Sequence, residues 1–312
     1  MRCLVTGAGG FIGSALVQRL VQHGHQVRAL LHRQKPKQPL PTVEHVVGDI
    51  TDSASLDALV QHIDVVFHCA ALVKDYGVAA PIMQVNLEAT QQLANVCDNH
   101  IKRFIYLGHL SFENKKHVGT YTASKAQAEQ YLQEQYHEKK FPMVTIRPGN
   151  VYGPGATTWV LRPLKAIQQN RITLVDQGNG IFLHTYIDNL VDALLVAMTM
   201  PNIEGEAIDI TDGDHTTTWG TYLNDLARIA HKPPITRNLS IPAALLISKL
   251  MMVRYHVLHQ EPWVTPTAVH IFTNRRTISL KKAQQLLSYT PSINYTEGMK
   301  RVEQWLINEH YV

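Results

Sequence analysis

Short apolar runs alternate with helical patterns through the first half of the chain. Strand-like runs cover 1–5, 27–31, 43–47, 64–68, 103–107 and 143–146, and helical patterns cover 11–23, 53–62, 80–99 and 119–137. Strands that alternate with helices predict βαβ units, which build a parallel sheet through right-handed crossovers. We therefore expect an α/β fold with a doubly wound parallel sheet, whose ligands bind beyond the carboxyl ends of the strands.

The alternation loosens beyond residue 147. Short strand-like runs at 172–175 and 207–210 separate helical patterns near 159–170, 187–200, 218–231, 242–258 and 296–309. This change predicts a sheet domain over 1–155 and a smaller, partly interwoven C-terminal lobe over 156–312. Residues about 176–200 are expected to return to the sheet domain.

A glycine-rich turn follows the first strand and reads Thr6-Gly7-Ala8-Gly9-Gly10-Phe11-Ile12-Gly13. Glycine accepts φ > 0 and lets a pyrophosphate approach the backbone. The helix N-terminus behind the turn offers free N–H groups to phosphates, and the third glycine lets the helix pack closely on the strand. The turn therefore predicts a dinucleotide site at Gly7, Gly10, Phe11, Ile12 and Gly13. Its spacing is Gly-x-x-Gly-x-x-Gly and differs from the Gly-x-Gly-x-x-Gly of most two-domain dehydrogenases.

Tyr121 and Lys125 stand four residues apart on a helical pattern, so they share a face. A free tyrosine has a pKa of about 10, and a cation one turn away lowers it. A proton-transfer residue needs such a pKa when a carbonyl is reduced or an alcohol is oxidised. The pair alone also fits an ordinary amphipathic helix, and the glycine turn upstream favours the functional interpretation.

The composition indicates a globular, small-molecule-binding protein. Of 312 residues, 45% are hydrophobic and 17% charged, and the net charge is only +4. Such a chain buries a sizeable core, and it has no Lys/Arg run that would indicate nucleic-acid binding. Cys3, Cys69 and Cys97 lie in apolar patterns, which suits reduced thiols and a cytoplasmic location.

Two further features bear on targeting and metals. Met1 leads straight into the first strand, so no signal peptide is expected. The apolar run 241–258 contains Lys249 and Arg254, so we expect it to line a pocket or contact a membrane peripherally rather than span it. His256 and His259 have no cysteine or carboxylate cluster beside them in the sequence, so no metal site is expected.

Several further motifs accompany the glycine turn and the Tyr121–Lys125 pair, and together they carry a family resemblance. They are Gly48-Asp49-Ile50, His68-Cys69-Ala70-Ala71, Val85-Asn86-Leu87, the run from Arg147 to Gly155, the run from Tyr186 to Ala193, and the run from Leu287 to Pro291. Over nearly its whole length the chain resembles the extended short-chain dehydrogenases/reductases, which include the NAD-dependent epimerase/dehydratase family.

The resemblance implies a fold, a cofactor and roles for particular residues. The fold is a Rossmann-type doubly wound sheet with a substrate-binding C-terminal lobe. Tyr121 is implied to be the catalytic acid/base, and Lys125 also to hold the nicotinamide ribose. A homodimer through the helices at 80–99 and 119–137 is implied as well. The remaining residues implied to bind the cofactor are Asp49, Ile50, Ala70, Ala71, Asn86, Pro148 and Val151.

One position departs from the family pattern. The family usually carries a Ser or Thr just after the fifth strand, where it binds the substrate oxygen. This chain has His109 there, and Ser111 follows two residues later. Three interpretations stay open: Ser111 acts through a shifted loop, which we favour slightly; His109 substitutes for the hydroxyl; or the protein is catalytically weak.

The end of the second strand bears on cofactor choice. An acidic residue there would bond the ribose 2′-OH and repel a 2′-phosphate. The chain instead has His32 and Arg33, with Lys35 and Lys37 beyond, and an arginine can clamp a phosphate. NADP(H) is therefore favoured, while NAD(H) stays possible because an Arg33 that only stacks on the adenine would not distinguish the two cofactors.

The order of segments in the C-terminal lobe resembles the 3β-hydroxysteroid dehydrogenase and dihydroflavonol reductase branch. The segments are Ile241-Pro242 with its apolar helix, Pro262 to Pro266, and Thr277 to Pro291. This implies an NAD(P)(H)-dependent oxidoreductase of a hydrophobic ketone or alcohol. The alternatives are a nucleotide-sugar epimerase or dehydratase with tightly held NAD, and a non-catalytic NADP-binding regulatory protein.

Overall fold

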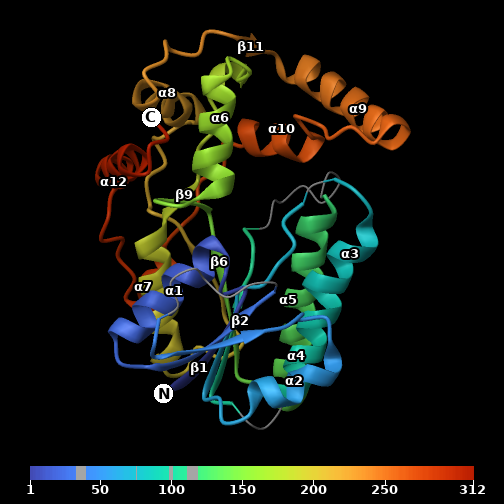
Figure 1. The fold of residues 1–312 in the computed structure, drawn as a ribbon, viewed down its shortest axis with the longest axis vertical. Coiled ribbons are helices and arrows are strands. Elements are labelled where there is room, and N and C mark those ends of the chain that lie inside the picture. Colours follow the sequence, from blue (N-terminus) through green and yellow to red (C-terminus); the bar gives the residue numbers. More distant parts are fainter. Residues whose placement is uncertain (33–39, 75, 98–100, 111–118) are drawn as a thin grey trace.

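The computed structural model describes residues 1–32, 40–74, 76–97, 101–110 and 119–312. Its centre is a seven-stranded sheet in the order β10-β6-β5-β4-β1-β2-β3, and every neighbouring pair is parallel (Figure 1). The strands are β1 (Arg2–Thr6), β2 (Gln26–Leu31), β3 (Val43–Val47), β4 (Val65–His68), β5 (Arg103–Leu107), β6 (Met143–Pro148) and β10 (Ala207–Ile210). The predicted doubly wound parallel sheet is confirmed.

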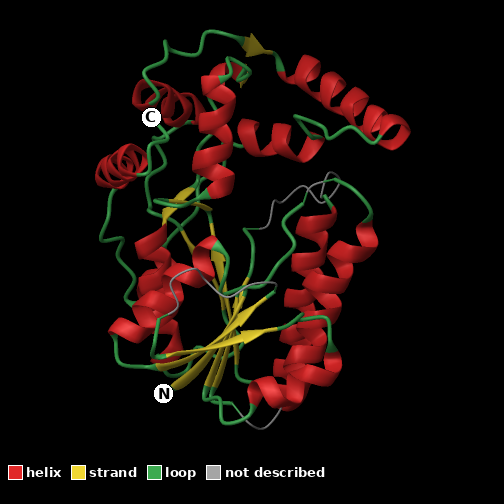
Figure 2. Ribbon diagram, in the orientation of Figure 1, coloured by secondary structure: helices red, strands yellow, loops and turns green. Residues whose placement is uncertain are grey.

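Helices cover both faces of the sheet (Figure 2), so the inner strands β1, β4 and β5 are almost wholly buried, while the edge strands β3 and β10 are not. One face carries α1 (Phe11–Gln22), α7 (Ile187–Thr199) and α11 (Lys281–Leu287). The other carries α2 (Ser53–Val60), α3 (Ala79–Met83), the π-helical turn η1 (Gln84–Glu88), α4 (Ala89–Cys97) and α5 (Thr120–Lys139).

The strand order reverses between β1 and β4. One crossover leaves β1 toward β2, while β4 lies on the opposite side of β1, so the loops after these two strands diverge. A crevice at such a switch point is where open α/β sheets bind their ligands. The glycine turn follows β1, and therefore lies at this crevice.

The C-terminal lobe lies over the carboxyl ends of the strands (Figure 1). Its helices are η3 (Thr157–Leu161), α6 (Arg162–Gln168), η4 (Asp176–Gly178), α8 (Trp219–Ile229), α9 (Ile241–Leu258), α10 (Pro266–Thr273) and α12 (Tyr295–Asn308). Two short parallel pairs complete the lobe: β7 (Asn150–Tyr152) with β9 (His184–Tyr186), and β8 (Leu174–Val175) with β11 (Asn238–Leu239).

The structure interweaves the two parts more than the sequence predicted. Besides α7, the strand β10 also joins the sheet, where Ala207 to Ile210 pair with β6. The predicted helix 80–99 contains the π-helical turn η1, and the predicted helix near 159–170 begins with η3. The strand-like run at 207–210 is confirmed as β10, and only its place at the edge of the sheet was not predicted. A π-turn leaves no hydrophobic periodicity of its own, so pattern reasoning misses it.

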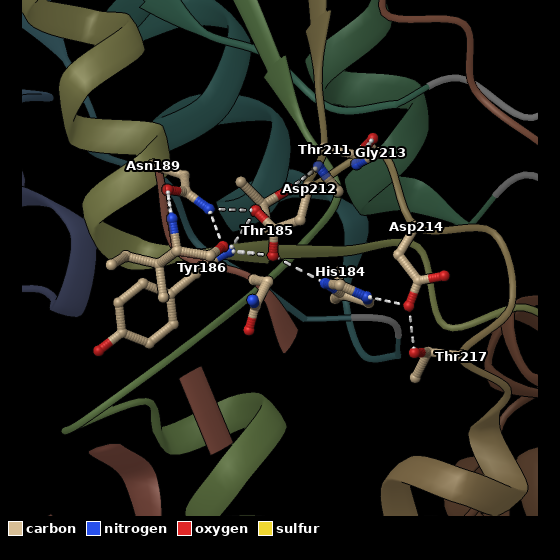
Figure 3. A network of polar contacts seen from close by, with 12 residues as sticks. His184, Thr185, Tyr186, Asn189, Thr211, Asp212, Gly213, Asp214 and Thr217 are labelled. Carbon is tan, nitrogen blue, oxygen red and sulfur yellow. Dashed lines mark hydrogen bonds and ion pairs between the residues drawn. The ribbon is translucent and has the colours of Figure 1, made fainter. Parts of the chain in front are cut away.

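A buried polar network holds the returning segments together (Figure 3). The His184 side chain is fully buried, with Nδ1 2.7 Å from Asp212 Oδ2 and Nε2 3.5 Å from Asp214 Oδ2. Asp212 also accepts bonds from the Tyr186 N–H at 2.8 Å and the Asn189 Nδ2 group at 2.7 Å. The loop after β10 is thereby tied to β9 and to the start of α7.

Candidate active site

The glycine turn forms a cradle that a side chain would fill. Gly7 has φ +66°, and a Cβ on it would lie 2.7 Å from the Ala70 backbone nitrogen. A Cβ on Gly13 would collide with the Gly7 carbonyl oxygen. Gly10 is the N-cap of α1, so no side chain covers the free N–H groups of the first turn. Such a cradle fits the pyrophosphate of a dinucleotide.

The cradle opens into a cavity of about 890 Å³, near the upper end of the usual range for ligand sites. Residues from both the sheet domain and the C-terminal lobe line it. Those that the sequence predicted for the site are Gly7, Gly10, Phe11, Ile12, Gly13, Ala71, His109, Tyr121, Lys125, Pro148 and Val151.

Other lining residues were not among the site residues that the sequence predicted. They come from the loop after β4 and from the C-terminal lobe: Val73, Tyr76, Trp159, Arg162, Trp263 and Ile271. Their places depend on how the lobe packs over the sheet, which no local periodicity encodes. The sequence offered one hint, the segment Pro262 to Pro266 that resembles the hydroxysteroid dehydrogenase branch and contains Trp263.

Lys125 is buried behind Tyr121. The lysine is 3% exposed, and its Nζ lies 4.1 Å from the centroid of the Tyr106 ring. Burial lowers the pKa of Lys125 to about 7, against the opposing influence of Cys69 and Glu129. The ring face gives the ammonium a favourable contact that partly offsets the loss of water. Near neutral pH the ammonium and the neutral amine of Lys125 are therefore both populated.

His109 lies directly against Tyr121. Its ring meets the tyrosine ring edge-on, with centroids 5.6 Å apart. Burial, and then the charge of Lys125, lower the pKa of His109 to about 4, so the imidazole is neutral at pH 7. A neutral imidazole carries one N–H donor. Ser111, the other candidate for this role, lies outside the described residues.

Asn86 lies in η1 and is 1% exposed. Its Oδ1 accepts from the Leu72 N–H at 2.7 Å, and its Nδ2 donates to Leu72 O at 3.2 Å and to Ser124 Oγ at 3.0 Å. Asn86 does not line the cavity. Its amide joins the loop after β4 to α5, which carries Tyr121.

The loop after β4 is also held by a hydrogen bond to the end of β1. The Ala70 N–H donates to Thr6 Oγ1 at 3.2 Å, and Thr6 Oγ1 lies 2.7 Å from Nδ1 of the buried His68. Ala70 does not line the cavity itself, but its backbone sets the width of the cradle at Gly7.

The described residues among the remaining cofactor predictions, His32, Asp49 and Ile50, lie beyond β2 and β3 and do not line the cavity. His32 Nε2 is 3.2 Å from Asp49 Oδ2, and both side chains are exposed. The backbone N–H and hydroxyl of Thr51 hold the pKa of Asp49 below its usual value. Ile50 is buried in the core against α2. Arg33 lies outside the described residues.

Within the described ranges, no group of three or more His, Cys, Asp and Glu side chains is arranged to hold a metal ion.

A glycine cradle at a sheet switch point, continuous with a cavity of this size, is the architecture of a dinucleotide-dependent enzyme. The cavity also receives a tyrosine and a lysine from one helical turn, which is the arrangement of short-chain dehydrogenases/reductases. The chain belongs to the NAD dependent epimerase/dehydratase family, which matches residues 3–211.

Curated relatives extend over nearly the whole chain. A 2-alkyl-3-oxoalkanoate reductase of Stenotrophomonas maltophilia is 27% identical, covering 97% of this chain and 98% of its own. A 3-beta-hydroxysteroid dehydrogenase of Mycolicibacterium neoaurum is 27% identical, covering 96% and 89%. The chain is thus an NAD(P)-dependent oxidoreductase, and the predicted resemblance to the hydroxysteroid dehydrogenase branch is confirmed.

Solved structures share the fold. A UDP-glucuronic acid 4-epimerase from Bacillus cereus in complex with NAD has a TM-score of 0.78 and 24% identity, covering 100% of both chains. The WbmF enzyme of Bordetella bronchiseptica in complex with NADH has a TM-score of 0.78 and 19% identity, covering 99% of this chain and 93% of its own.

Proposed function

We propose that the protein interconverts a hydrophobic ketone and its alcohol, with NADP(H) as the favoured cofactor. The cavity that carries this proposal joins the glycine cradle to Tyr121 and then to a wall of apolar and aromatic side chains from the C-terminal lobe. The reductase and dehydrogenase relatives support the reaction class. The absence of an acidic residue at the end of β2, where His32 and then Arg33 stand, supports NADP(H).

The proposal assigns each residue a task. The first turn of α1 holds the cofactor's pyrophosphate, with Gly7 and Gly13 leaving room for it. When bound, the cofactor supplies or accepts hydride at nicotinamide C4. Tyr121 gives its phenolic proton to the substrate oxygen in reduction and takes it back in oxidation. Lys125, in its charged form, stabilises the phenolate that remains.

The function is tested first on the purified, full-length protein. Mass spectrometry establishes whether a cofactor is carried through purification, and calorimetric titration compares NADPH with NADH. We expect NADPH to bind about tenfold tighter or more, because a charge-assisted phosphate contact contributes about 1.5–3 kcal/mol. We also expect NADPH oxidation with water-soluble ketones whose KM falls as the alkyl chain lengthens.

Two other results of these experiments would each favour a different function. Retained NAD(H), together with conversion of a UDP-sugar without net cofactor turnover, would replace the proposal with an epimerase. Tight cofactor binding without turnover of any ketone, alcohol or UDP-sugar would indicate a regulatory protein.

We further propose that His109 orients the substrate oxygen. Its edge-on contact with Tyr121 and its neutral imidazole support it over Ser111. His109→Ala is expected to lower kcat/KM by about 10²-fold, the effect of losing one donor to a developing oxyanion. Ser111→Ala is the matched control and should leave kcat/KM nearly unchanged, as measured by steady-state kinetics.

A large loss in Ser111→Ala, with an active His109→Ala, would assign the role to the serine instead. His109→Ser provides a second readout, because a hydroxyl at this position should recover part of the activity that His109→Ala loses.

A further inference from the structure

Helix α9 lies on the outside of the C-terminal lobe (Figure 1). It exposes an apolar face there. Of its 18 residues only Ala244 and Ser248 are buried. Four residues on the opposite side are 56–70% exposed and follow one another at intervals of four, three and four, so they form one stripe. We call this the α9 stripe: Leu246, Leu250, Val253 and Val257.

The charges on α9 match an anionic surface. The helix contains no Asp or Glu, and Lys249 and Arg254 are both exposed. At about 100° per residue these two cations fall on opposite flanks of the α9 stripe. Long basic side chains beside an apolar face are typical of helices that lie in a membrane interface, where the stems cover apolar surface and the charges meet lipid headgroups.

The packing of α9 favours a helix that lies flat on the membrane. Among the described helices, α9 is the one long and apolar enough to cross a membrane by length and composition. Its inner face, however, packs into a core with α10, where Ala244 joins Val264 and Val269. A spanning helix would lose this core, whereas an interfacial one keeps it and still buries the stripe in lipid.

The rim of the cavity adjoins α9. Tyr255 of α9 meets Tyr76 edge-on, with ring centroids 5.4 Å apart, and Tyr76 lines the cavity. Trp263, which follows α9, and Val73 also line the cavity, although they are 62% and 54% exposed. One acidic residue, Glu261, lies at the same rim. Tryptophan at such a position is favoured at the membrane–water interface.

We propose that α9 docks the protein flat on an anionic lipid bilayer through the α9 stripe, Lys249 and Arg254. The cavity rim meets α9 through Tyr255, which at about 100° per residue lies on the inner side of the helix, so docking through the stripe leaves this contact intact. On the proposed function, to which this consequence is tied, docking keeps the protein at the surface of the lipid phase in which a hydrophobic ketone or alcohol dissolves.

Co-sedimentation of the full-length protein with vesicles tests the docking. The protein should bind vesicles of equimolar phosphatidylcholine and phosphatidylglycerol, and bind pure phosphatidylcholine more weakly. Leu246→Glu with Leu250→Glu should abolish binding to both. Lys249→Gln with Arg254→Gln should weaken binding to the anionic vesicles by about fivefold per cation, and change binding to phosphatidylcholine little.

Ile307→Glu is the matched control, since Ile307 is a 49% exposed apolar residue on α12. It should bind like the wild type. The proposal is overturned if the wild type binds neither vesicle, or if Ile307→Glu loses as much binding as the stripe variant. It is also overturned if sedimentation equilibrium shows that Leu246→Glu with Leu250→Glu converts a dimer to a monomer while vesicle binding is unchanged.

Vesicle binding needs no turnover, and the reductase assay uses water-soluble ketones. If the protein does not bind vesicles, the reductase assay can still succeed. If it reduces no ketone, vesicle binding can still be observed.

Discussion

Tyr121→Phe is expected to lower kcat by about 10²- to 10⁴-fold, the usual contribution of a positioned proton donor. The substitution removes the phenolic hydroxyl and keeps the ring that meets His109 edge-on. The cavity should therefore keep its shape, and calorimetry should find the Kd for NADPH nearly unchanged. Steady-state kinetics with a water-soluble ketone measures kcat.

Tyr131→Phe provides the matched control. Tyr131 lies further along α5, and its hydroxyl donates to Asn95 Oδ1 at 2.7 Å, away from the cavity. This variant should keep wild-type kcat. Equal losses in the two variants would attribute the effect to α5 itself, and an active Tyr121→Phe would remove Tyr121 from the proton-transfer role.

Lys125→Met is expected to stabilise the cofactor-free protein while it removes most of the activity. The folded pKa of Lys125 is about 7, below its ordinary value of 10.5, because burial disfavours the ammonium. Between these two values the unfolded chain binds a proton that the folded chain does not, so wild-type stability rises with pH. Below pH 7 the buried ammonium of Lys125 lowers the free energy of unfolding by its full amount, and above pH 10.5 this loss of stability is absent.

Methionine fills a similar volume without a charge, so Lys125→Met removes the free-energy cost of burying an ammonium group. Urea unfolding should show a gain of a few kcal/mol near pH 7, with an upper limit of about 5 kcal/mol at about 1.4 kcal/mol per pKa unit. The gain should shrink by about 3 kcal/mol between pH 7 and pH 9. Lys165→Met, at an exposed position on α6, should show neither effect.

A Lys125→Met protein that is less stable than the wild type at both pH values would contradict this account. It would mean that the contact of Nζ with the Tyr106 ring contributes more than the burial costs.

The parts of the site that the sequence could predict are those fixed by local backbone geometry. Gly7 must take a positive φ beneath Ala70, and Gly13 must leave room for the Gly7 carbonyl, so their spacing is visible in the chain itself. Tyr121 and Lys125 are likewise paired by helical periodicity alone. Both features need no knowledge of the C-terminal lobe.

The parts that escaped prediction depend on distant segments. Trp263 reaches the cavity only because α9 and α10 pack together above the sheet. The resemblance implies that Asn86 contacts the cofactor, which stays a prediction, whereas the bonds of its amide to Leu72 and Ser124 could not be predicted. A short motif gives the position of a side chain along the chain, and not the groups that compete for its hydrogen bonds.

The polar network around His184 has a consequence for how the chain is made. A nascent chain that has emerged only to residue 155 has all the strands from β1 to β6 but lacks α7, whose Asp188 pairs with Arg19 of α1. It also lacks the edge strand β10 and the Asp212 that secures the start of α7. The face of the sheet that carries α1 is thus only partly covered until α7 and β10 have been translated, and we expect the nucleotide-binding half to gain its full stability only then.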